Sequence, residues 1–270
     1  MDKKRQTYPT DVNDNQWALL APLFSEKTSR RGRPRSWSKR EILCAIFYIL
    51  RSGGAWRLMP HDFPPWQTVY GYYRQWREEG LWSQINTVLA EAVRKREGRE
   101  ARPSAAIIDS QSVKTAEGGE ERGVEVYKQV SGRKRHIVVD TLGLLWIVVV
   151  HSAGVPDGSG GKQTLQKLFE RIKGSLHNRW CRLKLIWADG AYEDIAAWVK
   201  QTCGWRLEVV RRPEGAKGFM VLPRRWVVER TFGWFGRYRR LSKDFEHQIE
   251  SSEAMVYLAS IHRMLRLLAG

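Results

Sequence analysis

Two aspartates each stand directly after a short apolar run that predicts a β-strand. Asp109 follows Ala105–Ile108, and Asp189 follows Leu183–Ala188 and precedes a glycine. Active sites in open α/β sheets are built at strand ends, and paired carboxylates there can share a hard divalent cation. The plainer alternative is that each Asp only begins a loop or caps a helix, and for either residue alone that alternative is favoured.

Glu229 is the third candidate, because of the helix that is predicted to carry it over residues 223–241. The residues within about 40° of Glu229 on the helical wheel are Arg225, Gly233, Gly236 and Arg240. A glycine inside a helix costs about 1 kcal/mol relative to alanine, so two on one face indicate clearance for something bulky, such as DNA with metal ions. Close packing of that face against another helix is the alternative.

Basic residues surround this acid and extend to other parts of the chain. Segment 224–243 holds seven Lys and Arg residues, and Glu229 is its only acid, which favours a phosphate-facing role. The stretch RRGRPR at 30–35 contains the Arg-Gly-Arg-Pro core of AT-hooks, which bind narrow A·T-rich minor grooves; a linker that contacts only the backbone is an equal alternative. The predicted DNA contacts are Arg31, Arg33, Arg35, Lys114, His136, Arg225, Arg230, Arg237, Arg239, Arg240 and Lys243. Lys114, His136 and also His151 are individually more often structural.

The bulk composition agrees with a nucleic-acid partner. The 270 residues carry a formal net charge of +17, and 42% are hydrophobic, which is enough for a sizeable core. A solubilising surface or a ribosome-associated protein is the plainer alternative. Three scattered cysteines predict neither a disulfide framework nor a zinc cluster. The start of the chain is polar and its longest apolar runs are short, so we expect a soluble, cytoplasmic protein, nucleoid-associated when bound to DNA, with no membrane partner.

The pattern of apolar residues predicts two domains. Residues 1–100 are expected to form an all-α domain with helices at 14–24, 38–52, 66–79 and 81–96 and a basic loop at 28–36. This pattern fits a helix-turn-helix module for binding DNA, although plain helical bundles share it.

The second predicted domain, 101–270, mixes strands and helices. Strands are expected at 105–110, 134–140, 144–152, 183–189 and 205–212, and helices at 161–173, 194–201, 223–241 and 252–268. This order indicates a mixed α/β sheet flanked by helices.

Three sequence blocks resemble those of DDE transposases, and more narrowly bacterial transposases of the insertion-sequence-five family. They are IIDSQSVKT around Asp109, WADGAY around Asp189 and RRWVVERTFGWFGRYRRLSKDFE around Glu229. GRKRHIVVDTLG at 132–143 and the N-terminal stretches DNQWALLAPLF, RRGRPR and SGGAWRLMPHDFPPWQTVYGYYRQW are similar to the same family. The resemblance therefore covers nearly the whole chain.

The resemblance implies a ribonuclease-H-like fold with Asp109 on the first strand, Asp189 after the fourth and Glu229 on a later helix. It implies cleavage at the ends of an insertion sequence and strand transfer of the 3′-OH into target DNA. The three acids would hold two Mg²⁺ ions, for which Mn²⁺ can substitute, with Asp109 bridging both. The partners would be double-stranded DNA, as terminal inverted repeats and target, and a second copy of the chain in a synaptic homodimer.

One departure from the related signature of Tyr, Arg, Glu and Lys concerns the residues around the acid. Arg225 fits the signature arginine, but Leu222 stands in place of the tyrosine and Gly236 in place of the lysine. Arg237 or Arg240 is the candidate replacement for that lysine.

Two other functions remain open at this point, a DNA-binding regulator with a degenerate nuclease fold and a stand-alone nuclease. Four further acids are interpreted as structural. Asp140 suits a hairpin turn, Glu193 and Asp194 suit the start of a helix, and Asp157 lies in a Gly-rich loop.

Overall fold

The computed structural model describes residues 5–24, 37–116, 119–174, 182–211 and 224–270. The strands that it describes are β1 (Ala105–Lys114), β2 (Gly123–Glu125), β3 (Val130–Asp140), β4 (Leu145–Ser152), β5 (Leu185–Ala188) and β6 (Arg206–Val209). The longer helices are α1 (Asp14–Leu20), α2 (Lys39–Ser52), α3 (Trp66–Glu78), α4 (Leu81–Arg96), α5 (Asp157–Lys173), α7 (Trp226–Phe235) and α8 (Ile249–Ala269). Predictions for the basic loop at 28–36 fall outside the described residues.

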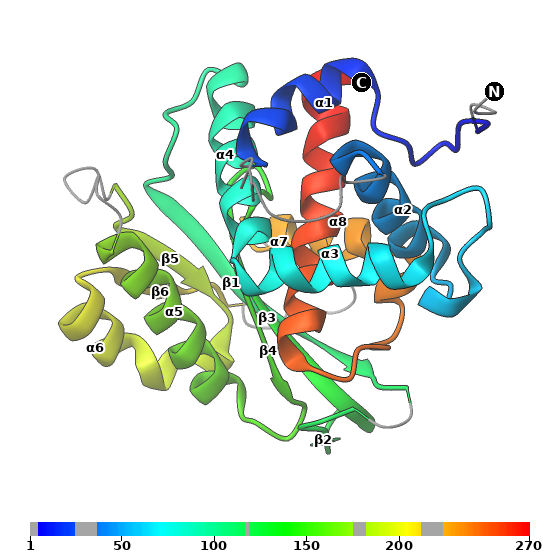
Figure 1. Cartoon of the computed structure of the whole chain (residues 1–270). Helices are drawn as coiled ribbons and strands as arrows, with labels where there is room; N and C mark the ends of the chain where they lie inside the picture. The colour runs from blue at the N-terminus through cyan, green and yellow to red at the C-terminus, as the bar shows by residue number, and fades with distance from the viewer. Residues whose placement is uncertain (1–4, 25–36, 117–118, 175–181, 212–223) are drawn as a thin grey trace.

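One mixed sheet forms the centre of the fold. Its strands follow the order β2, β3, β1, β5 and β6, and β4 also pairs with β3. β1 is antiparallel to β3 and parallel to β5, and β5 is parallel to β6. Helices cover both faces: α5 lies on one, and α7 and α8 lie on the other (Figure 1). This confirms the predicted mixed α/β, ribonuclease-H-like sheet preceded by an all-α region.

The N-terminal helices do not build a core of their own. Buried side chains of α2, α3 and α4 belong to one apolar cluster with those of α7, α8 and one face of the sheet. Figure 1 shows α8 running between the N-terminal helices. The ring of Phe47 lies 4.8 Å from that of His262, and the Tyr73 hydroxyl donates to the Ser251 carbonyl at 2.9 Å. The chain is all-α before residue 100 and mixes strands with helices after it, but residues from both parts share one apolar core.

The ends of the first helices follow from local sequence. The side chain of Asn13 accepts a hydrogen bond from the Gln16 N–H, and the Asn13 N–H donates one to the side-chain oxygen of Gln16. Ser38 caps α2 by accepting from the Glu41 N–H. Gly53 ends α2 in the left-handed conformation at φ 76°, and a Cβ there would lie 2.9 Å from the Arg239 Cβ. This close approach brings the N-terminal region against the segment that follows α7.

Several predicted boundaries were wrong. β1 continues beyond residue 110, so Asp109 lies inside a strand and not at its end. α5 begins at Asp157 and not at residue 161, and a short mixed helix over 190–203 replaces the helix predicted at 194–201. α7 ends at Phe235, because the chain turns at Gly236 and is extended at Tyr238, with ψ 109°. The three-residue strand β2 was not predicted.

Among the described residues, every helix is too short or too polar to cross a membrane.

Candidate active site

Strand register brings Asp109 and Asp189 together. β1 and β5 pair in parallel from Ala105 with Leu185 to Ile107 with Trp187, a constant offset of 80 residues. The same offset separates Asp109 from Asp189, so the two carboxylates lie beside each other just beyond the end of β5. Side chains alternate across a strand, and both aspartates therefore project from the face that α7 covers.

α7 supplies the third carboxylate. Val227, Val228 and Thr231 on this helix are buried, whereas the Glu229 side chain is 49% exposed. The helix is therefore anchored by its apolar side, and Glu229 stands on the side that faces out over the sheet edge.

The three carboxylates converge on the guanidinium of Arg225, the residue before α7. Its Nη2 lies 3.6 Å from Asp109, 3.7 Å from Asp189 and 3.8 Å from Glu229. Three acids that are 40 or more residues apart in sequence thus surround a single cationic group.

Among the described residues, no group of three His, Cys, Asp or Glu side chains has the spacing of a formed metal site. The donor chemistry nevertheless fits a hard divalent cation, because carboxylates from three elements converge on one positive charge. The pKa of Asp109 is raised to about 6, mainly by burial and also by the charges of Asp189 and Glu229, while the Ser110 N–H and Arg225 act in the opposite direction. Three carboxylates face one guanidinium, so the cluster is short of positive charge.

Gly233 leaves open space on the outer side of α7, one helical turn after Glu229. No described atom lies within 4 Å of a Cβ built at this position, which supports clearance over close helix packing. The prediction that Gly236 and Arg240 share this helix face was wrong, because α7 ends at Phe235.

A largely buried polar network lies under β1, on the face of the sheet opposite Asp109. Ser110 donates to Asp157 at 2.7 Å, and Ser112 bonds to Glu125. Lys134, on β3, lies 3.0 Å from Asp157 and 3.8 Å from Glu125. The network ties β1 to β2, β3 and the first turn of α5, and so fixes the strand that carries the first aspartate.

Sequence reasoning missed the role of the neighbouring arginines of β3. Arg133 donates to the carbonyls of Glu246 and His247, and Arg135 donates to that of Leu241, all at 2.8 Å or less. Both arginines are 3% exposed or less, and they hold the segment that follows α7. Their alternation with Lys134 directly before the apolar run 137–139 was the signal that these charges point to both faces.

Two of the predicted DNA contacts lie at a groove beside the carboxylates. Lys114 and Lys243 are exposed. Together with Gln111 and the residues that follow it on β1, and with Gly236, they line a groove of about 330 Å³. Gln111 follows Asp109 on the same face of β1, so the groove continues from the carboxylate cluster. Its lining contains no acid among the described residues.

The other predicted DNA contacts have different surroundings. Arg237 and Arg239 are exposed, and Arg230 stacks between Trp226 and Trp234 at 4.3 and 4.5 Å. Arg31, Arg33 and Arg35 fall outside the described residues.

The structure contradicts a DNA contact by His136 and by Arg240. His136 is fully buried and pairs with His151 at 2.8 Å, and burial lowers its pKa to about 3. Arg240 is buried between the Glu246 carboxylate, at 2.7 Å, and the Gly54 carbonyl, at 2.9 Å. Neither side chain reaches the surface, so both are structural.

Asp140 and Glu193 also have structural partners. Asp140 accepts from the N–H groups of Leu142 and Leu144 in the hairpin turn and pairs with Arg94 of α4 at 2.5 Å. Glu193 pairs with Arg211 at the surface. The turn interpretation of Asp140 is confirmed, and α4 is tied to the sheet through it.

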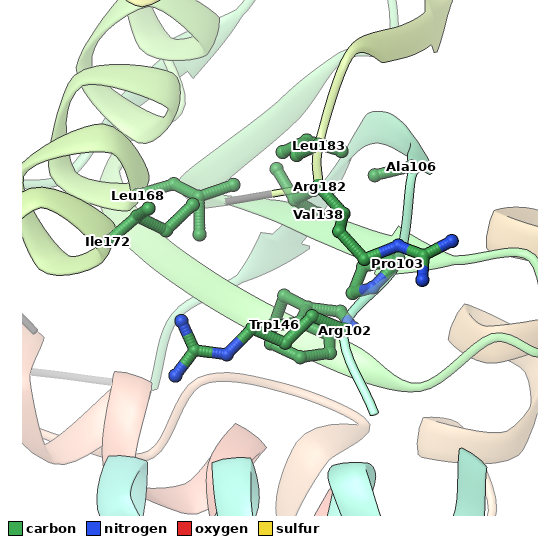
Figure 2. A pocket seen from close by; sticks show the side chains of 9 residues that line it. All are labelled: Arg102, Pro103, Ala106, Val138, Trp146, Leu168, Ile172, Arg182 and Leu183. Carbon is green, nitrogen blue, oxygen red and sulfur yellow. The ribbon is translucent and has the colours of Figure 1, made fainter. Parts of the chain in front are cut away.

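A second hollow lies on the α5 face and does not have the character of an active site. Leu168 and Ile172 of α5, Trp146 of β4 and Leu183 line it with three further apolar residues and two arginines (Figure 2). Its only charged lining residues are Arg102 and Arg182, and its volume is about 30 Å³. It therefore offers neither an acid nor a nucleophile.

Comparisons with known proteins place this geometry among transposases. Residues 100–264 match the family model described as "Transposase DDE domain", and residues 12–86 match a model for transposases of the IS4/5 family. The "Insertion element IS402 uncharacterized 16.2 kDa protein" of Burkholderia cepacia is 26% identical over 117 residues, 42% of this chain and 78% of its own length. "Uncharacterized protein y4sN" of Sinorhizobium fredii (strain NBRC 101917 / NGR234) is 30% identical over 103 residues, 38% of this chain and 75% of its own length. No solved structure matches the chain.

Proposed function

The chain belongs to the family of transposases with a DDE domain, and on that premise we propose that it cuts DNA at the ends of an insertion sequence and joins the freed 3′-OH to target DNA. The observation that carries the proposal is the convergence of Asp109, Asp189 and Glu229 on one point, Arg225 Nη2, within 3.8 Å. They come from two adjacent strands and a helix, so the fold itself assembles the acidic site.

Divalent cations are the cofactor that this site would hold. Asp109, Asp189 and Glu229 would hold two Mg²⁺ ions, with Mn²⁺ able to replace them. When bound, such ions activate the attacking oxygen and stabilise the leaving oxygen of an in-line displacement at phosphorus. The raised pKa of Asp109 agrees with this role, because a carboxylate that is costly to ionise alone gains from a neighbouring cation.

The rest of the site would bind and orient DNA. Lys114 and Lys243 would neutralise phosphates in the groove beside the carboxylates, and Arg237 and Arg239 would do so on the outer surface. Gly233 leaves room for the strand to approach Glu229. The attacking group would be water in the first step and the 3′-OH of the element end in the second.

The proposed substrates are terminal inverted repeats and target DNA, and the proposed assembly is a homodimer. Two element ends must be held together before both are joined to one target, which two copies of the chain would do. The N-terminal helices and the basic loop at 28–36 are the proposed sites of end recognition.

Asp109→Asn tests the assignment with a labelled element end, a supercoiled target and Mg²⁺. We expect the variant to bind DNA as the parent does and to lose both cleavage and strand transfer. A variant that cuts at the parental rate would exclude Asp109 from the reaction. Cleavage by the parent without any joined product would identify a nuclease, and binding without cleavage would identify a regulator.

A further inference from the structure

We propose that Arg225 couples DNA binding to metal binding, by leaving the carboxylate cluster for a DNA phosphate as the divalent cation enters. This inference rests on the proposed function, because it takes the three carboxylates as the metal ligands. It assigns to Arg225 a positioning role in addition to simple attraction of DNA.

The first observation is that Arg225 competes for the same ligands. A guanidinium within 3.8 Å of all three carboxylates stands where a bound cation would experience like-charge repulsion. A divalent ion and the guanidinium are therefore alternative partners of the cluster, and each weakens the binding of the other.

The second observation is that Arg225 is held by charge and not by hydrogen bonds. Charge-assisted hydrogen bonds from arginine to carboxylate are usually about 2.7–2.9 Å long, whereas the three contacts here are 3.6–3.8 Å. Among the described atoms, its buried Nε also has no hydrogen-bond partner. Within the described part of the chain, the guanidinium therefore loses no hydrogen bond when it moves away from the cluster.

The third observation is that a phosphate can form short hydrogen bonds with Arg225, which the three carboxylates do not. Arginine and phosphate form two parallel, short hydrogen bonds, and the side chain is 15% exposed, so it borders the surface. Arg225 also directly precedes α7, next to Arg224 with its strained φ of 70°. DNA that takes the guanidinium would leave three uncompensated carboxylates and thereby strengthen metal binding.

Because linkage is reciprocal, DNA and metal must then raise each other's affinity by the same factor. The experiment measures Mn²⁺ binding to the full chain by electron paramagnetic resonance of the free ion, with and without a 20-base-pair duplex of random sequence. Mn²⁺ bound by the duplex alone is subtracted. We expect the duplex to tighten Mn²⁺ binding by the parent by about tenfold.

Arg225→Gln removes the competing charge, and Arg224→Gln is the matched control. Arg224 stacks on Trp187 at 4.4 Å and pairs with none of the three carboxylates, yet its loss changes the net charge equally. We expect Arg225→Gln to bind Mn²⁺ about tenfold more tightly than the parent without DNA, and to gain nothing further from the duplex. The control should keep the parental affinity and the parental response to DNA.

Two results would overturn the coupling. One is a parent whose Mn²⁺ affinity does not change with DNA, which needs no variant at all. The other is an Arg225→Gln protein, with its far-ultraviolet circular dichroism unchanged, that binds Mn²⁺ as the parent does or more weakly. Asp109→Asn separates the two levels: if it still binds Mn²⁺, the metal site itself is wrong, and if it does not, only the role of Arg225 is in question.

Discussion

The Nζ of Lys134 lies 3.0 Å from the carboxylate of Asp157, on the face of the sheet opposite Asp109. The lysine side chain is only 4% exposed and also faces Glu125 at 3.8 Å. Removing one partner of a buried ion pair leaves an uncompensated charge inside the protein.

Lys134→Met is therefore expected to lower the free energy of unfolding by about 3–5 kcal/mol. Urea denaturation followed by circular dichroism measures the loss, and Lys184→Met, at an exposed position, is the control. An unchanged unfolding midpoint for Lys134→Met would show that Asp157 and Glu125 do not depend on this charge.

The pKa of Asp109 predicts a pH-dependent gain in stability for Asp109→Asn without metal. The folded pKa of about 6 lies above the ordinary value of 3.8, so ionisation opposes folding. This cost is absent below pH 3.8, grows between 3.8 and 6, and is complete above 6. At pH 7.5 in a chelator, the variant should be more stable than the parent by about 3 kcal/mol. The difference should vanish near pH 4, and thermal unfolding at both pH values measures it; a difference that is equal at both would refute the shift.

Gly233 allows clearance for DNA to be separated from folding. A Cβ at position 233 meets no described atom outside the backbone of its own helix, and Gly233→Leu improves helix propensity by about 0.8–1 kcal/mol, so the thermal midpoint should stay or rise. Cleavage of an element end should fall by about tenfold, because the side chain stands beside Glu229. Gly71→Leu is the matched control, since Gly71 is also an open mid-helix glycine, on α3. Parental cleavage by Gly233→Leu would show that DNA does not approach over this face.

The groove beside the carboxylates predicts a change in salt dependence. Each phosphate contact contributes about −0.9 to the slope of log K against log salt. Lys114→Ala and Lys243→Ala should each make the slope shallower by about 1, and the double variant by about 2. Fluorescence anisotropy of a labelled duplex at several salt concentrations gives the slope. A double variant with the parental slope would exclude the groove as a phosphate site.

Much of the fold could be predicted because the buried positions of helices and strands are apolar and recur at regular spacing in the sequence. The predicted limits of α4, 81–96, were confirmed, and every predicted strand was found, because most of them have an uninterrupted apolar centre. The end of α7 could not be predicted from its apolar period. Tyr238 and Leu241 continue that period and are buried, but they are reached through a turn and not through further helix.

The sequence predicted the three acids of the candidate site. It did not predict the buried basic residues of β3 that support the site. Asp109 and Asp189 were recognised because apolar strand cores precede them. The buried Arg133 and Lys134 were not, since Lys and Arg are almost never fully buried unless they are paired. Their partners come from segments far away in the sequence, which only the fold brings together.

The apolar cluster that α8 shares with the N-terminal helices has a consequence for the order of synthesis. Domains generally form as the chain emerges, N-terminal parts first, but Phe47 and Tyr73 find their partners His262 and Ser251 only after about 180 or more further residues have been made. The helical region is therefore expected to keep an incomplete core until the last helix has been made. α7, which carries Glu229, packs into the same apolar cluster, so we expect a chain that is interrupted before α8 to lack a properly placed third carboxylate.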